Sequence, residues 1–453
     1  MGYLGAVRAG ALAVVLSCVP TIAHAESLKE ALASAYTNNP NIMSALLDVK
    51  STAEGIALAK SGKLPTIGIS ATAGASWSAG NPLGDSLDIN YGQVGASYNQ
   101  TLFDNFQTEA EIEQARALTE LSKYTLRNQE QNVLLSVVQA YFGVIRDTQL
   151  VQLRADNMSF FDAQVGSAED RLRLGEGTRI DVSQARTRQA AAIASYQAAI
   201  ASLQTSQASY ERWVGHKPKN LSSDYNFGKS LPGSIDSAIA SAEERHPALL
   251  SARAAIRVAQ AGSDAASAAF GPKLNMIGQL CAIGCFGLDN PGASGSLNFQ
   301  LTIPIYAGGA LGASIRRANI EQIKSEVDAL SARDQIRESV ISAWSSLQNS
   351  SAQIESAQSA VESGQLVVEG TVQERDVGQK TTLDVLNAQA ELTQAREGLI
   401  QARASRMIAA FALLAASGRL SAEDLRLNVE VHSADGYIAK VEDVWQELRA
   451  LDE

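Results

Sequence analysis

The residue types that perform most catalysis are sparse in this chain of 453 residues, and they form no recognised catalytic pattern. The histidines beyond the amino-terminal segment are His216, His246 and His432, which are far apart in the sequence and lack neighbours that could share a metal ion. The nucleophile elbow, the H-E-x-x-H zinc motif and the P-loop are missing, and Gly175-x-Gly177 lacks the third glycine and the preceding strand of a dinucleotide-binding turn. We therefore predict that the protein is not an enzyme and uses no metal and no other cofactor.

Two cysteines, Cys281 and Cys285, are spaced as C-x3-C. Such a pair is at most half of a metal site, and neither a histidine nor a second cysteine pair lies near it in the sequence. In an oxidising compartment the spacing favours a small loop disulfide between Cys281 and Cys285, with two free thiols as the alternative.

Two glycine-containing segments, residues 174–178 (Leu-Gly-Glu-Gly-Thr) and 377–381 (Val-Gly-Gln-Lys-Thr), predict tight turns between helices. Each segment is followed by an acid, Asp181 after the first and Asp384 after the second. A carboxylate in the first turn of a helix complements the helix dipole, so both acids are candidate helix caps.

The spacing of the prolines indicates which elements position these residues. Residues 83–217 and 305–453 contain no proline. A globular α/β enzyme needs many sharp turns, which proline and glycine supply, so the two stretches predict very long helices instead. The formal charge of −11 argues against a nucleic-acid partner, which needs a basic face, and the patterned apolar fraction of 45% argues against disorder.

The amino terminus has the features of a secretory signal peptide over residues 1–25. An apolar stretch, residues 9–19, is followed by an A-x-A cleavage site, residues 23–25, immediately before Glu26. The alternative is a lipoprotein signal in which Cys18 is acylated. Beyond this segment we expect no apolar run near the ~18 residues of a membrane helix, so any membrane crossing is expected to use strands.

An internal repeat divides the rest of the chain. Residues 31–35 parallel residues 238–242 at an offset of 207, and the turns and the acids described above are related by an offset of 203. We expect the following domains: a first repeat over residues 26–215, an equatorial linker over 216–235, a second repeat over 236–416 and an equatorial or carboxy-terminal tail over 417–453.

Each repeat is expected to contain the same elements in the same order. The elements are a helix of moderate length (about 27–62 and 235–270), two strands, a long helix (about 106–172 and 309–374), a glycine turn and a return helix (about 180–213 and 382–416). Heptad-like seams in the long helices, such as Leu134, Val137 and Tyr141, predict rods on the order of 100 Å that supercoil around their neighbours. A two-stranded coiled coil is the alternative.

The strands alternate apolar and small polar residues with a period of two. The alternation is regular in residues 67–78 and 296–305, and a one-residue slip between Tyr91 and Val94 predicts a β-bulge. Alternation over about ten residues is typical of a barrel strand that faces lipid on one side and water on the other. An ordinary soluble β-sandwich, whose strands also alternate, is the alternative.

Four strands cannot close a membrane barrel by themselves, because such barrels start at about eight strands. Unpaired backbone groups at a sheet edge cost several kcal/mol each in lipid, so the edges are expected to pair with other copies of the chain. Two copies would give eight strands with a filled interior and three would give twelve with a lumen, so a conduit needs at least three copies.

Several segments in a specific order resemble the TolC family of outer-membrane efflux proteins, over residues 26 to about 425. These segments are Glu26-Ser-Leu-Lys-Glu-Ala-Leu with Asn39-Pro40, Lys63-Leu-Pro65, Ile303-Pro-Ile-Tyr-Ala-Gly-Gly309 and Val377-Gly-Gln-Lys-Thr-Thr-Leu-Asp-Val-Leu386. The resemblance implies a mainly α fold with a membrane β-barrel: a trimeric 12-stranded β-barrel continuous with a long α-helical periplasmic barrel.

The resemblance also implies a function and partners. The family forms the exit duct of the outer membrane, in contact with outer-membrane lipid and with its helical part in the periplasm. Such a homotrimer passes small molecules, as in multidrug resistance, or secreted polypeptides, as in type I secretion, from an inner-membrane transporter and a periplasmic adaptor to the cell exterior. The alternative from a different class is an exported coiled-coil structural or adhesion protein.

Carried over by position, the resemblance implies adaptor contacts at the turns. The residues concerned are Gly175, Gly177, Thr178, Gly378 and Gln379. Turn glycines with no partner are the alternative.

The resemblance further implies a periplasmic gate just inside the turns. Asp384 matches an acidic ring whose second acidic position is Asn387 here, and Asp181 matches the gate acid of the other hairpin. Lys380 matches the basic residue of the gate, and Arg375 stands where the best-known member has tyrosine. We expect Arg375 to form an ion pair with Asp181 and the missing carboxylate at Asn387 to weaken cation binding at the mouth. The cap and gate roles of the two acids are compatible, and both remain open.

Overall fold

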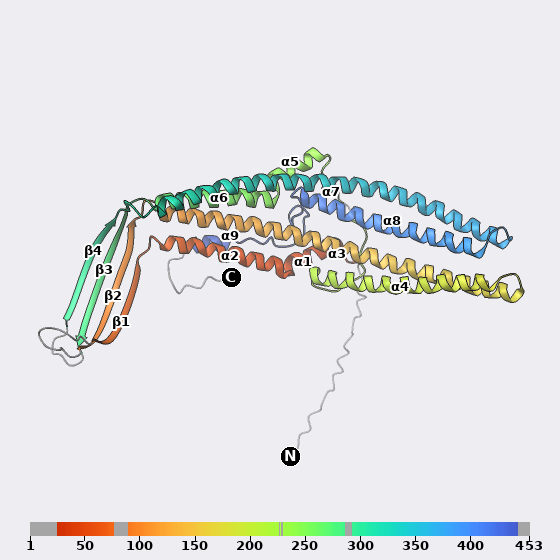
Figure 1. Ribbon diagram of the computed structural model, residues 1–453, viewed down its shortest axis with the longest axis horizontal. Helices are drawn as coiled ribbons and strands as arrows, with labels where there is room; N and C mark the ends of the chain where they lie inside the picture. The colour runs from red at the N-terminus through yellow and green to blue at the C-terminus, as the bar shows by residue number, and fades with distance from the viewer. Residues whose placement is uncertain (1–24, 77–88, 226, 228–229, 286–291, 443–453) are drawn as a thin grey trace, which may run out of the picture.

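The computed structural model describes residues 25–76, 89–225, 227, 230–285 and 292–442. The chain forms a long rod of helices with a four-stranded sheet at one end (Figure 1). The helices are α1 (Leu28–Asn38), α2 (Pro40–Ser61), α3 (Gln107–Leu174), α4 (Arg179–Val214), α5 (Ile235–Arg245), α6 (Pro247–Ala268), α7 (Ala310–Asp376), α8 (Thr382–Ala416) and α9 (Asp435–Glu442). The strands are β1 (Thr66–Ser76), β2 (Ile89–Phe103), β3 (Lys273–Cys285) and β4 (Gly292–Thr302). The order of elements from α1 to α4 therefore recurs from α5 to α8.

Parts of two predicted segments lie outside the described residues. They are residues 1–24 of the predicted signal peptide, which include Cys18, and residues 443–453 of the predicted tail.

The predicted helix of moderate length in each half is in fact two helices, which corrects the expectation of a continuous one. The breaks are at Asn39, between α1 and α2, and at His246, between α5 and α6. Both residues are extended because a proline follows, which disfavours helical backbone in the preceding residue. The side chains of Asn39 and His246 accept hydrogen bonds from the backbone N–H groups of Asn41 and Ala248, so each residue caps the second helix of its pair.

The strands form one antiparallel sheet in the order β1-β2-β3-β4. The two halves of the chain meet where β2 pairs with β3, and the described part of the sheet has free edges at β1 and β4. Ile69 lies opposite Ala96, and Ala96 lies opposite Leu280. Because side chains alternate along a strand, this register gathers most of the apolar residues on one face and most of the small polar residues on the other, with Ile277 and Gln100 as exceptions.

The irregularity in β2 lies near its end and not where the sequence predicted it. β1 and β2 pair without interruption from Ile89 to Asn99, so the register has no bulge between Tyr91 and Val94. The register shifts instead between Thr101 and Phe103, opposite β3.

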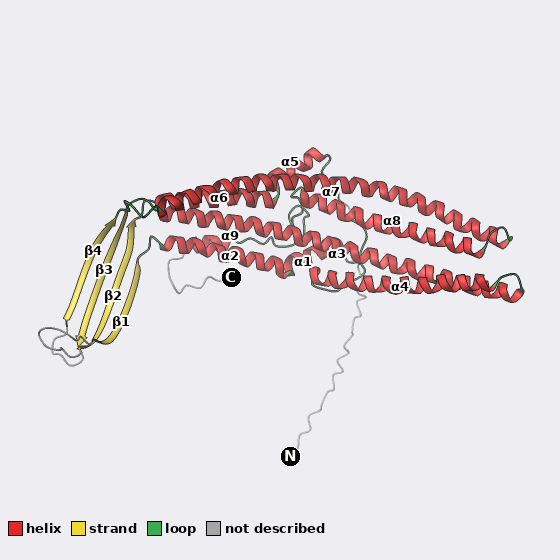
Figure 2. Cartoon of the chain, viewed as in Figure 1, coloured by secondary structure: helices red, strands yellow, loops and turns green. Residues whose placement is uncertain are grey.

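The largest hydrophobic core lies about halfway along the rod, where the middle of α3 meets α1, α2 and the carboxy-terminal segment (Figure 2). Leu134, Val137 and Tyr141 of α3 are fully buried there, in agreement with the predicted seam. Leu420 and Leu425 contribute to the same core from the segment that follows α8. Residues 417–442 are therefore an integral part of the middle of the rod.

One helix among the described residues, α8, is long and apolar enough by length and composition to cross a membrane. This corrects the expectation that no such run follows the amino-terminal segment. Its 18-residue stretch has a mean hydropathy of 1.4, and 39% of the stretch is buried in the protein. Phe411, Leu413 and Leu414 pack in two hydrophobic cores, so the apolar character of α8 is that of a core helix.

The two long helices form antiparallel hairpins with the helices that follow them, α3 with α4 and α7 with α8 (Figure 1). With 68 residues in α3 and 67 in α7, each long helix is about 100 Å in length at ~1.5 Å per residue. Both hairpin turns therefore lie at the end of the rod opposite the sheet.

Candidate functional site

The two hairpins end in turns of nearly the same geometry. Gly175 and Gly378 have φ angles of 81° and 80°, a region that glycine adopts without a Cβ penalty. The N–H of Glu176 donates to the carbonyl of Arg171 at 2.9 Å, and the corresponding bond of the second turn, from Gln379 to the carbonyl of Glu374, is 2.8 Å. The tight turns predicted from the glycines are thus present, and each satisfies the last carbonyls of its long helix.

Asp181 and Asp384 complete capping boxes with the N-cap residues Thr178 and Thr381 at the start of the helices that leave these turns. The Asp181 carboxylate accepts hydrogen bonds from the backbone N–H and the hydroxyl of Thr178 at 2.9 and 2.6 Å, and Asp384 accepts the same pair from Thr381 at 2.8 Å each. The hydroxyl of Thr178 is the main reason why the pKa of Asp181 is lowered, and the backbone N–H of Thr381 is the main reason for the lowered pKa of Asp384. Both acids are therefore ionised caps at neutral pH.

Arg375 does not form the predicted ion pair with Asp181. Its guanidinium donates to the neighbouring Asp376 at 2.8 Å and to the side chain of Gln164 on α3 at 2.7 Å. Arg375 sits at the end of α7 and is buried, and its guanidinium contacts α3 through Gln164. Among the described residues it therefore links the long helices of the two hairpins.

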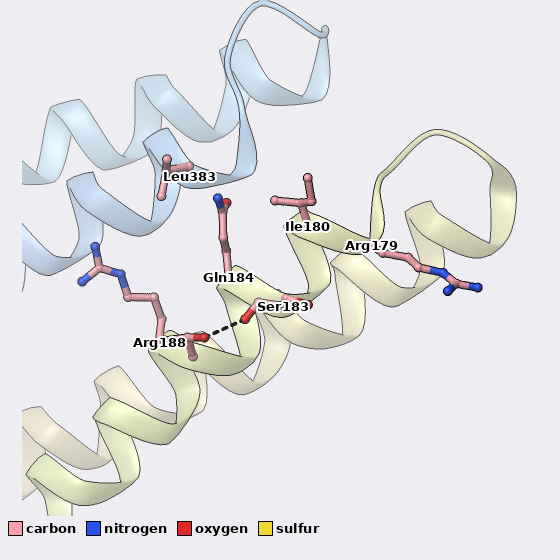
Figure 3. Close-up of a pocket in the computed structure, with 7 residues that line it drawn as sticks. Arg179, Ile180, Ser183, Gln184, Arg188 and Leu383 are labelled. Carbon is pink, nitrogen blue, oxygen red and sulfur yellow. Dashed lines mark hydrogen bonds between the residues drawn. The ribbon is translucent and has the colours of Figure 1, made fainter.

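Asn387 and Arg188 form a second link between the hairpins, which the sequence did not indicate. The guanidinium of Arg188 on α4 donates to the side-chain oxygen of Asn387 on α8 at 2.9 Å. Arg188 also lines a groove of about 540 Å³ between α4 and α8, together with Arg179, Ile180, Gln184 and Leu383 (Figure 3). A positive charge thus lies beside the position that lacks the expected acid.

Lys380 lies on the exposed turn itself and helps to lower the pKa of Asp384 through its charge, after the two hydrogen bonds from Thr381. The predicted gate residues therefore gather within the last turns of both hairpins, although their partners differ from those expected.

Further from the turns, the hairpins are joined by buried polar contacts that sequence reasoning missed. Asn157 of α3 accepts a hydrogen bond from the hydroxyl of Thr393 at 2.9 Å and a longer one from the amide of Gln389 at 3.4 Å, and all three residues are buried. Arg154 and Glu397 form a half-buried ion pair at 2.5 Å nearby. Burial raises the pKa of Glu397, and the charge of Arg154 opposes that rise.

A signal for part of this network was present in the sequence. Asn157 lies four residues before buried Phe161, and Gln389 lies four residues after buried Val385, so both are polar residues in otherwise apolar helical rows. Arg188 carries no such signal, because its contact depends on how two separate hairpins lie against each other.

The hairpin ends expose apolar side chains at matching positions. Leu174 and Val377 precede the two turn glycines and are 73% and 71% exposed. Ile180 follows the first turn and is also largely exposed, and Leu383 occupies the corresponding place after the second turn. Exposed apolar residues gathered at one end of a rod are typical of a docking surface.

The apolar face of the sheet is likewise uncovered. Ile69, Leu280 and Leu297, from three different strands, are 81%, 66% and 62% exposed. The opposite face carries polar residues such as Ser70, Ser97 and Gln279. The sheet therefore presents an apolar surface on one side and a polar surface on the other.

The cysteine pair does not form the predicted disulfide. Cys281 is a free thiol, and both cysteines belong to the extended strand β3. Residues four apart on a strand are separated by about 13 Å, whereas a disulfide requires Cα atoms within about 7 Å. The C-x3-C segment is a strand, so the loop that a disulfide would need is missing.

Known outer membrane efflux proteins match this chain along almost its whole length. The family model described as outer membrane efflux protein matches residues 31–216 and 238–419. The outer membrane efflux protein BepC of Brucella suis biovar 1 is 35% identical over 431 residues, which cover 94% of this chain and 93% of that protein. The outer membrane protein TolC of Escherichia coli (strain K12) is 24% identical over 427 residues, covering 90% of this chain and 86% of TolC. The alkaline protease secretion protein AprF of Pseudomonas aeruginosa is 25% identical over 417 residues, covering 87% and 84%.

Solved structures show the same fold. The CmeC outer membrane channel of Campylobacter jejuni superposes with a TM-score of 0.78 at 16% identity, covering 92% of this chain and 89% of CmeC. The outer membrane protein VceC of Vibrio cholerae superposes with a TM-score of 0.72 at 18% identity, covering 86% and 96%.

Proposed function

The chain belongs to the outer membrane efflux protein family, and on that premise we propose that it works as a homotrimer in which three copies enclose one duct. The protein is an exit duct of the outer membrane for efflux or secretion, and its helical part lies in the periplasm. The observation that carries the trimer proposal is the four-stranded sheet, which has an exposed apolar face and, in its described part, two free edges. An exported structural or adhesion rod would account for the long helices but gives no reason for such a sheet.

The dimensions of the sheet suit a membrane. β1 and β4 contain 11 residues each, which span about 37 Å along the strand. Tilted by about 45°, such a strand rises about 25 Å, the height of the apolar band of an outer-membrane barrel. The apolar face would then contact lipid, and the polar face would line the lumen of a twelve-stranded barrel.

The long helices support the same assembly. Ile320, Ile323, Val327 and Leu330 follow one another on α7 at spacings of three and four, and all are more than half exposed. Leu47 and Leu58 on α2 are also uncovered. A row of exposed apolar residues with heptad spacing is suited to pack against a helix of another copy, which would continue the barrel from the strands into the helices.

At the periplasmic end, the turns are the surface that we propose for the adaptor. Leu174, Ile180 and Val377 would supply apolar contacts there. The turns that hold these residues at the surface are formed by Gly175, Gly177, Thr178, Gly378 and Gln379. An inner-membrane transporter would deliver small molecules or polypeptides into the duct that the adaptor connects to it.

The same turns would form the gate of the duct. Asp181 and Asp384 would place ionised carboxylates at the mouth, with Lys380 beside the second. Arg375 and Asn387 hold the two hairpins of a protomer together, through Gln164 and Arg188 respectively. Opening would separate the hairpins and break both links, and the exposed link between Arg188 and Asn387 would cost ~0.2–1 kcal/mol.

Two measurements test the proposal. The mass of the detergent-solubilised protein should correspond to three copies, and a monomer or dimer would contradict the duct. In planar bilayers, Asp181→Ala and Asp384→Ala should raise single-channel conductance, because loss of the caps loosens the turns. Unchanged conductance in both variants would remove these acids from the gate.

A further inference from the structure

The backbone of Glu26 forms hydrogen bonds with the linker between the two halves of the chain. Its N–H donates to the carbonyl of Asn220 at 3.1 Å, and its carbonyl accepts from the N–H of Ser222 at 3.0 Å, which forms a short parallel bridge around Leu221. The hydroxyl of buried Tyr141 donates to the carbonyls of Glu26 and Ser222 at 2.8 and 2.7 Å. These contacts fix the residue that precedes α1 in the middle of the rod.

The side chain of Glu26 lies in a polar site that is nearly closed to solvent. The side chain is 11% exposed, and its Oε1 accepts a hydrogen bond from the hydroxyl of Tyr210 at 2.7 Å and lies 3.3 Å from Nε2 of His216. Burial raises the pKa of Tyr210, and the hydrogen bond to Glu26 raises it further, so this hydroxyl remains a donor at physiological pH. Within the described part of the chain, the second carboxylate oxygen, Oε2, is buried without a hydrogen-bond partner.

An unpartnered carboxylate oxygen in a buried site indicates a missing donor, because such groups are nearly always hydrogen-bonded. The predicted cleavage site ends at Ala25, which is exposed and precedes Glu26 directly. Cleavage there would generate a cation on Glu26, whose carboxylate oxygen Oε2 has no partner among the described residues.

We propose that this site binds the amino terminus of the processed chain, that is, the α-ammonium group of Glu26. Hydrolysis of the Ala25–Glu26 peptide bond by a leader protease consumes one water molecule. Ala25 leaves with a carboxylate, and the amide nitrogen of Glu26 gains protons to become an ammonium. One N–H of that ammonium keeps the bond to Asn220, and the two additional donors and the positive charge neutralise the buried carboxylate of the same residue.

The site thereby discriminates between two routes of maturation. If the chain were instead acylated at Cys18, the nitrogen of Glu26 would remain a neutral amide with a single donor, which the carbonyl of Asn220 already uses. Processing before Glu26 would complete the site and secure the linker over residues 216–222 against the start of α1.

The first test is direct. Intact mass and amino-terminal sequencing of the protein purified from outer membranes should give Glu26 as the first residue. An acylated Cys18, or any other first residue, would overturn the proposal.

The second test measures the contribution of the ammonium. Insertion of Gly-Ser between Ala25 and Glu26 leaves the cleavage site and the side chains unchanged but converts the Glu26 nitrogen to an amide. We expect trypsin to cut the native protein after exposed Lys219 roughly three- to tenfold faster, because local opening of the linker becomes easier. The rate of cutting at Arg316 in α7 is the internal control for global unfolding.

The matched control is Glu26→Gln with and without the same insertion. Because the carboxylate is then absent, the insertion should change cutting after Lys219 by less than about twofold. An equal acceleration in the glutamate and glutamine backgrounds would overturn the proposal, since the ammonium would then make no specific contact with the carboxylate.

Discussion

The two long helices are almost equal in length, yet they are buried to very different extents. Of the 68 residues of α3, 21 are buried, whereas only 6 of the 67 residues of α7 are. The difference arises because α1, α2 and the segment after α8 pack on α3 in one large hydrophobic core, whereas the core in which α5 and α6 pack on α7 is smaller. The same order of elements thus yields a helix that holds one protomer together and a helix that offers its surface to another protomer.

The contrast continues along the exposed side of α7. Its apolar residues are spaced as regularly as those of the α3 seam, but Ile320, Ile323 and Val327 remain uncovered whereas Leu134 and Val137 do not. Periodicity therefore identifies a packing face without stating whether the partner is in the same chain.

The largest expected effect comes from placing charge on the uncovered face of α7. The double variant Ile323→Asp/Val327→Asp should abolish the trimer, because the carboxylates of all three copies would be buried without partners. Mass photometry in detergent measures the change. Lys324→Asp, on the same helix, is the control and should remain trimeric. A trimeric double variant would show that this face is not the interface.

The next largest effect is expected when the substitution of a buried leucine of α3 is compared with that of an exposed leucine of α7. Leu134→Ala should lower the free energy of unfolding by about 3 kcal/mol, since it removes a fully buried side chain and leaves a cavity. Leu330→Ala, in the exposed row of α7, should leave the folding of the protomer nearly unchanged and weaken only its association. Denaturant unfolding together with the oligomer mass separates the two outcomes. Equal losses of folding stability would refute the contrast between the helices.

A smaller effect is expected where the hairpins meet. Thr393→Val removes the hydroxyl that bonds buried Asn157 and should cost ~1–2 kcal/mol, because the Asn157 oxygen keeps only its longer bond to Gln389. Thr371→Val is the matched control, since the hydroxyl of Thr371 is exposed and bonds only the carbonyl of Val367 within α7. Thermal unfolding of both variants should show a loss for the first alone.

The smallest effect concerns an acid in the core around α3. Burial raises the pKa of Glu130, although the hydroxyl of Tyr36 donates to it at 2.9 Å. A carboxyl group whose pKa is raised by folding loses stability as the pH rises from its ordinary value of ~4.3 through the folded value. Glu130→Gln should therefore raise the unfolding midpoint at pH 7 and have less effect at pH 4. Exposed Glu338→Gln on α7 should show no such difference, and an equal response of both variants would contradict the assignment.

Much of this architecture was predictable because it depends on local chemistry. Glycines at 175 and 378, the prolines and the alternation in the strands predicted the turns, the long helices and the two-faced sheet. Errors arose where one pattern allows two conformations. The segment before β1 was expected to be one helix although Pro40 starts a second one, and the cysteine pair was assigned to a loop although it lies in β3.

The site was only partly predictable. Asp181 and Asp384 were identified as caps, because a cap depends on residues three positions apart. The partner of Arg375 was predicted wrongly, because its contact with Gln164 depends on the rotation of α7 against α3.

What the sequence determined by itself was the set of elements, their lengths and the periodicity of their faces, since backbone sterics and hydrogen bonding act over a few residues. Tertiary structure alone decided which polar groups meet across elements, such as Arg188 with Asn387 and Tyr210 with Glu26. The reason is physical: residues about two hundred positions apart are brought together by the register and rotation of whole helices, and a contact of 3 Å is lost when a helix turns by one residue.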